Sequence, residues 1–161
     1  MKVLVIGHGG HGKDTFANML VEKYNLKFVS ASEFACKHIV FPAMRANYST
    51  AEECYNDKFS HREYWKRLIS EYNKEDKLKL VKEVLKESDI YVGLRDIEEY
   101  EECKRLELFD YIFTIFNPRV ERESSYSIPL NEGKLILNEK GLIDLKMTVD
   151  ELHLTNTKTE V

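Results

Sequence analysis

A glycine-rich run near the start of the chain constrains the fold more than any other feature. Residues 2–6 form an apolar run rich in β-branched side chains, which is typical of a buried strand. The segment from Gly7 to Gly12 follows, and its four glycines end the strand. From Lys13 onward, apolar residues recur at helical spacing, namely Phe16, Ala17, Met19, Leu20 and Tyr24. The order strand, glycine loop, helix is the one that a phosphate-binding site requires.

The glycine spacing Gly7-x4-Gly12-Lys13 matches the frame of a Walker A loop. Glycine lets backbone N–H groups turn inward toward phosphate oxygens, where a Cβ would block them. The start of the following helix adds a partial positive charge, and the Lys13 ammonium can reach the terminal phosphates. We therefore predict that ATP phosphates contact this loop through Gly7, Gly9, Gly10, His11, Gly12, Lys13, Asp14 and Thr15. The alternative is an ordinary tight turn that binds nothing.

The residue after the loop lysine departs from the usual frame, which has Ser or Thr there to hold magnesium. This chain has Asp14 at that place, followed by Thr15. A carboxylate can bind Mg²⁺ directly or through its water shell, because this ion keeps several waters. We predict Asp14 and Thr15 as the metal-binding residues.

Length and charge narrow the class of protein. A chain of 161 residues predicts a single domain over residues 1–161. Its 24 basic and 28 acidic residues are mixed along the chain, which argues against a nucleic-acid polymer as partner. The three cysteines lack metal-ligand spacing, so we expect reduced thiols. We expect a cytoplasmic protein without a membrane partner, because no secretory signal and no membrane-length apolar run is present.

Hydrophobic periodicity predicts strands that alternate with helices. The expected strands are 2–6, 27–30, 89–94, 111–116 and 135–138. Helices are expected to begin at residues 13, 31 and 75. Two more are expected to begin at a cap, one at the capping box of Ser60 and Glu63 and one at Asp96. The last expected helix covers 145–153. Residues 41–57 read as loop and short helix, and 117–130 as a long charged connection. This alternation predicts an α/β fold with a five-stranded parallel sheet and helices on both faces.

Ligands of such sheets bind beyond the carboxyl ends of the strands. We therefore expect Gly7–Thr15, Ser30–Ser32, Gly93–Arg95 and the start of the 117–130 connection to form one site. Phosphoryl transfer needs cations around the phosphates, and we predict Lys13, Arg95, Arg119 and Arg122 as catalytic. Alternatively, Arg95 forms a surface salt bridge to the neighbouring acidic helix, and the other two arginines lie in a solvated loop.

Several other residues are candidates for the acceptor site, namely Ser30, Ser32, Lys58, Arg62, Trp65 and Arg95. Cations among them suit a phosphorylated acceptor, and Trp65 can stack on a base. The alternative for Trp65 is a place in the core, where aromatic residues of amphipathic helices more often lie.

The chain resembles the P-loop nucleoside monophosphate kinases, and most closely the viral, phage-type deoxynucleoside monophosphate kinase family. The resemblance rests on Gly12-Lys13-Asp14-Thr15, on Leu94-Arg95-Asp96-Ile97-Glu98-Glu99 and on the segment from Ile136 to Leu152. It implies a three-layer P-loop NTPase fold with a helical monophosphate-binding insert near 32–72 and a short arginine-bearing lid near 117–130. Related kinases often have an acidic residue before the strand-end arginine, whereas this chain has Gly93-Leu94. A viral member would work in the host cytoplasm.

The function that fits best is ATP- and Mg²⁺-dependent phosphoryl transfer to a nucleoside or deoxynucleoside monophosphate, which gives the diphosphate. One alternative keeps the reaction and changes the acceptor to dephospho-coenzyme A or phosphomevalonate. Another is a nucleotide-binding module without turnover, although the nearest match to a guanine-reading motif, Thr157-Lys158-Thr159-Glu160, ends with the wrong residue. The base, the sugar and a homodimer stay open.

Overall fold

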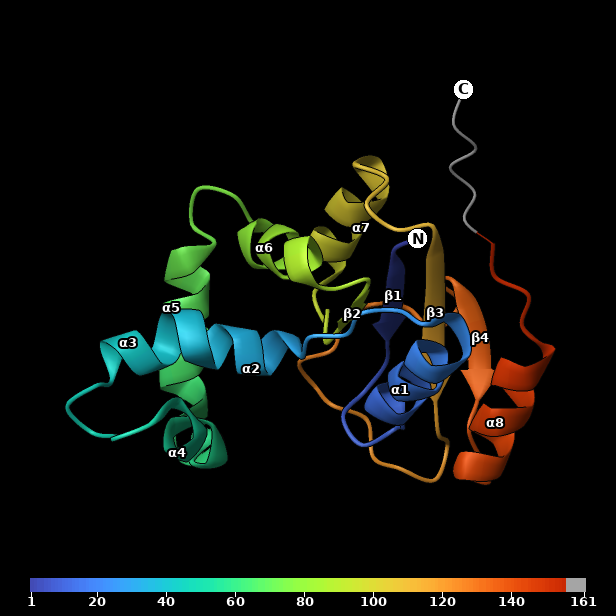
Figure 1. Ribbon diagram of the computed structural model, residues 1–161, viewed down its shortest axis with the longest axis horizontal. Helices are drawn as coiled ribbons and strands as arrows, with labels where there is room; N and C mark the ends of the chain where they lie inside the picture. The colour runs from blue at the N-terminus through green and yellow to red at the C-terminus, as the bar shows by residue number, and fades with distance from the viewer. Residues whose placement is uncertain (156–161) are drawn as a thin grey trace.

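The centre of the structure is a parallel β-sheet with helices on both faces (Figure 1). This computed structural model describes residues 1–155, so the Thr157–Glu160 segment lies outside the described residues. The sheet has four strands in the order β2-β1-β3-β4, with bounds Val3–Ile6 for β1, Ile90–Val92 for β2, Tyr111–Phe116 for β3 and Lys134–Leu137 for β4. Val3 pairs with Ile90 on one side and with Tyr111 on the other.

Alternate residues of the central strand β1 pack on opposite faces of the sheet, and all four are fully buried. Val3 and Val5 contact the layer of α1 (Lys13–Tyr24) and α8 (Leu142–Glu151). Leu4 and Ile6 contact the layer of α2 (Ala31–Ala35), α6 (Lys79–Glu87) and α7 (Ile97–Arg105). A strand buried on both faces is what the continuous apolar run predicts. The predicted α/β class with helices on both faces is confirmed.

The segment between α2 and α6 is helical and projects from the sheet as an arm (Figure 1). It comprises the π-helix η1 (Cys36–Val40), α3 (Phe41–Ala43), α4 (Ala51–Asn56), the 3-10 helix η2 (Lys58–His61) and α5 (Arg62–Tyr72). The arm has its own apolar cluster of Cys36, Val40, Met44, Cys54 and Trp65. Short helices within residues 41–57 agree with the expectation for that stretch.

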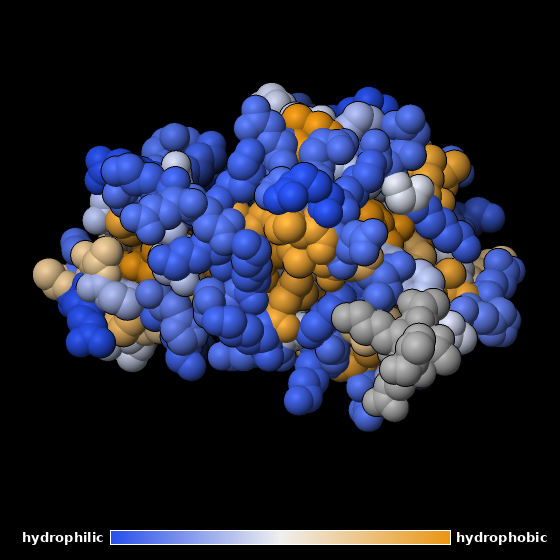
Figure 2. Space-filling view, turned by 90° about the horizontal axis from the view of Figure 1, so that it is seen from above, coloured by the Kyte–Doolittle hydropathy of each residue, from blue (hydrophilic) through white to orange (hydrophobic). Residues whose placement is uncertain are grey.

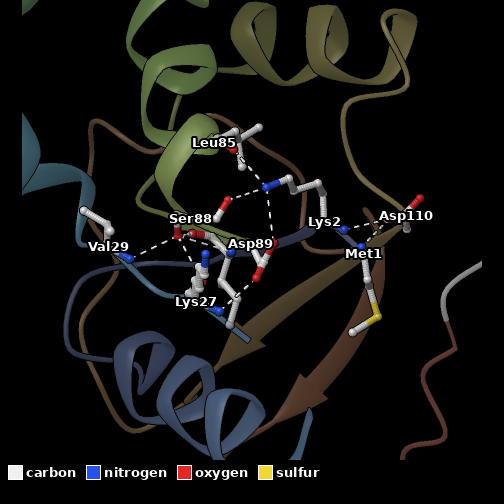
Figure 3. A network of polar contacts seen from close by, with 9 residues as sticks. Met1, Lys2, Lys27, Val29, Leu85, Ser88, Asp89 and Asp110 are labelled. Carbon is white, nitrogen blue, oxygen red and sulfur yellow. Dashed lines mark hydrogen bonds and ion pairs between the residues drawn. The ribbon is translucent and has the colours of Figure 1, made fainter. Parts of the chain in front are cut away.

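The prediction of five strands is wrong, because residues 27–30 do not form a strand. They meet the sheet at a single bridge between Phe28 and Ile90. On either side of this bridge, the backbone N–H groups bond to side chains of the neighbouring segment. The Ser88 hydroxyl accepts from the Val29 N–H at 3.0 Å, and the Asp89 carboxylate accepts from the Lys27 N–H at 2.9 Å (Figure 3). A strand needs consecutive backbone pairs, and these side chains replace them.

The predicted capping box of Ser60 and Glu63 is also wrong. Ser60 lies in η2 and donates to the Asp57 carboxylate at 2.6 Å, so α5 begins at Arg62 without a side-chain cap. The predicted Asp96 cap is confirmed, since its carboxylate accepts from the N–H groups of Glu98 and Glu99.

Several element bounds differ from the sequence prediction. The last helix spans Leu142–Glu151 instead of 145–153, and Gly141 stands at its N-cap position, four residues after the last strand ends. The helix expected from residue 75 begins at Lys79, and the strand expected over 89–94 covers only Ile90–Val92. All three cysteines are buried and free, as expected.

Hydrophilic residues cover most of the face seen from above, and hydrophobic residues gather between them (Figure 2). Within residues 1–155, no helix combines the length and the apolar character needed to cross a membrane.

Candidate functional site

The glycine loop, Gly7–Gly12, connects the carboxyl end of β1 to the first turn of α1. Three of its four glycines have backbone φ angles that other residues rarely adopt, +141° at Gly7, +75° at Gly10 and +104° at Gly12. A Cβ on Gly7 would collide with the Ile115 carbonyl of β3, and one on Gly12 would lie 2.7 Å from Asn138 Nδ2. The loop is therefore pressed against the ends of the neighbouring strands.

Lys13 is the first residue of α1, and its side chain folds back across the loop. The residue is 8% exposed, and its Nζ donates to the His8 carbonyl at 2.6 Å. Burial is the main cause that lowers the Lys13 pKa, and the nearby charge of Arg95 lowers it further. The charge of Arg95 thus acts on Lys13, and a bound anion near them would stabilise both cations.

The two loop histidines contact the 117–130 connection. His11 is fully buried, and its Nδ1 accepts from the Asn117 N–H at 2.9 Å. Its Nε2 must then carry the proton, which it donates to the Glu121 carbonyl at 3.1 Å. His8 Nδ1 accepts from the Glu123 N–H at 2.9 Å. The predicted contact of His11 with phosphate stays a prediction. In this structure both rings bind the 117–130 connection to the glycine loop.

A lowered pKa keeps His8 in its neutral form near pH 7. Burial is the largest cause, followed by the neighbouring His11 ring, whose centroid lies 5.2 Å away. The neutral ring is the form that can accept from the Glu123 N–H.

Arg95 leaves the carboxyl end of β2 and meets Glu123 of the connection. Its Nη1 lies 3.2 Å from Glu123 Oε1, and its carbonyl accepts from the Ser127 N–H at 2.9 Å. The alternative considered for Arg95, a surface salt bridge to the neighbouring acidic helix, is not the pair that forms. The structure brings together Lys13, Arg95, the glycine loop and the connection, as predicted for the carboxyl ends of the strands.

The arginines of the connection are placed differently from each other. The Arg122 guanidinium lies 4.8 Å from the centroid of the Phe116 ring, and its charge helps lower the His8 pKa. Arg119 is exposed, and its backbone N–H donates to the Asn117 side chain. Neither guanidinium forms an ion pair within residues 1–155.

Three candidate acceptor residues are linked through Tyr55 of the arm. The hydroxyls of Ser30 and Ser32 are 3.1 Å apart, and Ser32 Oγ is 3.2 Å from the Tyr55 hydroxyl. Lys58 Nζ donates to the same Tyr55 hydroxyl at 3.2 Å. This polar chain ties α2 to the arm, and in the described part of the protein no hydrogen bond or ion pair joins it to the glycine loop.

The other two candidates of the arm lie elsewhere. Trp65 is 8% exposed and belongs to the arm's apolar cluster, which is the core placement considered as the alternative. The Arg62 guanidinium lies 5.8 Å from the centroid of the exposed Phe59 ring.

Asp14 and Thr15 lie in the first turn of α1, directly beyond the loop lysine. Asp14 is exposed, and Thr15 is half-buried. Their hard oxygen atoms suit Mg²⁺, which takes one or two carboxylates and completes its shell with water and phosphate oxygens. No group of three or more His, Cys, Asp or Glu side chains among the described residues forms a metal cage.

Sequence reasoning missed two residues of the site, Glu123 and Asn138. Asn138 follows β4 directly, is 4% exposed and donates from Nδ2 to the His11 carbonyl at 2.9 Å. Its position at the carboxyl end of a strand was a usable signal. Glu123 had none, because nothing in the sequence distinguishes it from Glu121 two residues earlier.

Comparison with known proteins returned no match among protein-family models and none among curated protein sequences.

Proposed function

We propose that this protein is an ATP-dependent kinase of a nucleoside or deoxynucleoside monophosphate, with the glycine loop as its phosphate site. The observation that carries the proposal is the convergence of Lys13 and Arg95 on one glycine loop at the carboxyl ends of adjacent strands. Two cations that act on each other in this way favour a ligand with several negative charges. A triphosphate provides such a ligand.

Each part of the site has a role in this reaction. The loop N–H groups and the start of α1 bind phosphate oxygens, and Lys13 neutralises the terminal phosphates. Arg95 stabilises the charge of the transferring phosphoryl group, for which its planar fork is suited. Arg119 and Arg122 belong to the same connection as Glu123 and supply further cations near the loop.

Asp14 and Thr15 would hold magnesium, which would bridge phosphate oxygens and offset their charge when bound. The exposed place of Asp14 in the first turn of α1 leaves room for the waters that this ion keeps. The hydroxyl and ammonium groups joined at Tyr55 are the proposed binding groups for the monophosphate, since Lys58 adds a cation to two serine hydroxyls.

A coupled assay of ADP release tests this function. The protein is incubated with ATP and Mg²⁺ against all common ribo- and deoxyribonucleoside monophosphates, dephospho-coenzyme A and phosphomevalonate. Turnover with a monophosphate is the expected result and names the base. Turnover with only dephospho-coenzyme A or phosphomevalonate would mean that the reaction is correctly assigned and the acceptor is not. No turnover with any acceptor would contradict the proposed kinase activity.

A further inference from the structure

The carboxylate of Glu123 lies directly on the glycine loop. A Cβ added to Gly9 would be 2.7 Å from Glu123 Oε1 and 3.1 Å from its Cδ, so the carboxylate packs against the bare Cα of that glycine. The same Oε1 lies 3.2 Å from Arg95 Nη1. The negative charge of Glu123 also acts on Lys13, where it opposes the lowering of the lysine pKa.

These neighbours are the groups that a terminal phosphate would contact. A phosphoryl group needs a close approach to glycine backbone, an arginine fork and a lysine charge. The Glu123 carboxylate is an anion that lies directly against the glycine backbone and the Arg95 guanidinium. Its charge also acts on Lys13. An acidic side chain among cations stabilises them in the same way that a bound anion would.

We infer that the Glu123 carboxylate is an internal occupant of the phosphate site, which takes the place of a terminal phosphoryl group until a nucleotide displaces it. This inference rests on the proposed function, because it assigns the glycine loop to phosphate. It also names the subsite: the space bounded by Gly9, Arg95 and Lys13 receives the terminal phosphoryl group.

The geometry makes the carboxylate easy to displace. Glu123 Oε2 is buried and has no hydrogen-bond partner among residues 1–155, so half of the carboxylate loses its contact with water without compensation. The backbone of the residue is anchored separately, by the hydrogen bond from its N–H to His8 Nδ1. Rotation of the side chain alone therefore clears the subsite, and the 117–130 connection stays in place.

Displacement also supplies Arg95 to the ligand. The guanidinium that pairs with one carboxylate in the free protein becomes available to pair with two oxygens of the phosphoryl group. Binding thus exchanges an internal anion of one charge for a ligand that carries more.

Titration with inorganic pyrophosphate in magnesium-free buffer tests this exchange, since pyrophosphate has no base to bind elsewhere. Glu123→Gln keeps the shape and the backbone hydrogen bond but removes the charge. Calorimetry should show that this variant binds pyrophosphate about five- to tenfold more tightly than the wild-type protein, a factor that corresponds to ~1–1.4 kcal/mol. Thermal unfolding of each variant verifies that it is folded.

Glu121→Gln is the matched control, because it makes the same charge change on the same segment. Glu121 is exposed, and its backbone carbonyl accepts a hydrogen bond from His11 Nε2. This variant should bind pyrophosphate as the wild-type protein does. An equal gain in both variants would mean that only the overall charge matters and would overturn the inference.

Other outcomes separate this inference from the proposed function. If the wild-type protein binds pyrophosphate and the folded Glu123→Gln variant binds it equally or more weakly, Glu123 is not a competitor and only the inference fails. If neither folded protein binds pyrophosphate, the glycine loop is not a phosphate site and the proposed function fails with it. Glu123→Ala, which removes the carboxylate entirely, should show the same gain as Glu123→Gln.

Discussion

Asn138 Nδ2 donates a hydrogen bond of 2.9 Å to the carbonyl of His11, and this bond joins the end of β4 to the glycine loop. Both residues are buried, at 4% and 0% exposure. The loop conformation therefore depends on a side chain 127 residues further along the chain.

Asn138→Ala should destabilise the protein by ~1–2 kcal/mol, because it leaves the buried His11 carbonyl without its donor. The loss stays modest because Asn138 Oδ1, which has no hydrogen-bond partner in the described residues, is removed as well. The free energy of unfolding is measured with denaturant. Asn18→Ala, on the exposed face of α1, is the control and should change little. Equal stability of both variants would show that the bond contributes nothing.

Lys13→Ala should lower turnover about 10²–10³-fold and leave the fold intact, because the ammonium acts on charge that develops in the transition state. Its burial already disfavours the charged form, and this penalty offsets the hydrogen bond lost to His8. Steady-state kinetics of phosphoryl transfer and circular dichroism are the measurements. Full activity in this variant would remove the lysine from the mechanism.

Lys23→Ala, on the same helix, should show the opposite pattern. Its Nζ donates to carbonyls at the end of α8, at 2.6 Å to Val149 and 2.6 Å to Leu152. Losing this cation at a helix C-terminus should cost ~1–2 kcal/mol of stability and leave turnover unchanged.

Arg95→Ala should reduce kcat/KM by the equivalent of ~2–4 kcal/mol, as expected for a preorganised electrostatic donor. Arg105→Ala is the matched control: Arg105 ends α7 and pairs with Glu102 on the exposed surface, where such pairs contribute little. Kinetics of both variants are compared under the same conditions. If Arg95→Ala kept the wild-type kcat/KM, Arg95 would have no part in the reaction and would serve only to pair with Glu123.

The wild-type protein should lose stability as the pH rises, and Glu99→Gln should abolish that loss. Burial, followed by the charge of Asp96, raises the Glu99 pKa from 4.5 to about 7. The folded state therefore binds more protons than the unfolded state between these pH values, so the wild-type protein loses stability as the pH rises through this range. After a discount for the partial exposure of this side chain, the variant should be ~1–2 kcal/mol more stable than the wild-type protein at pH 8.

The measurement is denaturant unfolding from pH 4 to pH 8, read as the difference between variant and wild type. Glu101→Gln, an exposed position on the same helix, serves as the control and should show a flat difference. A flat difference for Glu99→Gln as well would mean that the carboxyl titrates normally in the folded protein.

Local chemistry explains what could be predicted from the sequence. The strand before Gly7 and the helix after Gly12 were predictable because apolar periodicity and glycine spacing act over a few residues. The Asp96 cap was predictable for the same reason, as its carboxylate bonds N–H groups only two and three residues away.

Long-range side-chain bonds explain what could not be predicted. The segment 27–30 has a strand-like composition, but Ser88 and Asp89, about 60 residues later, provide its hydrogen bonds. In the site, the position of Arg95 at the end of a predicted strand was enough to predict that it lies near the glycine loop. Its partner Glu123, however, belongs to a connection without regular structure. Sequence spacing does not determine which carboxylate of that connection turns inward.

The two edges of the sheet differ in a way that limits how copies of this chain can join. At β2, the side chains of Ser88 and Asp89 already occupy the backbone groups of residues 27–29. At β4, the outer edge pairs with no strand among residues 1–155, and Leu135 and Leu137 are 44% and 53% exposed. Among the described residues, β4 is therefore the sheet edge whose backbone N–H and C=O groups are open to pairing with a strand of another molecule.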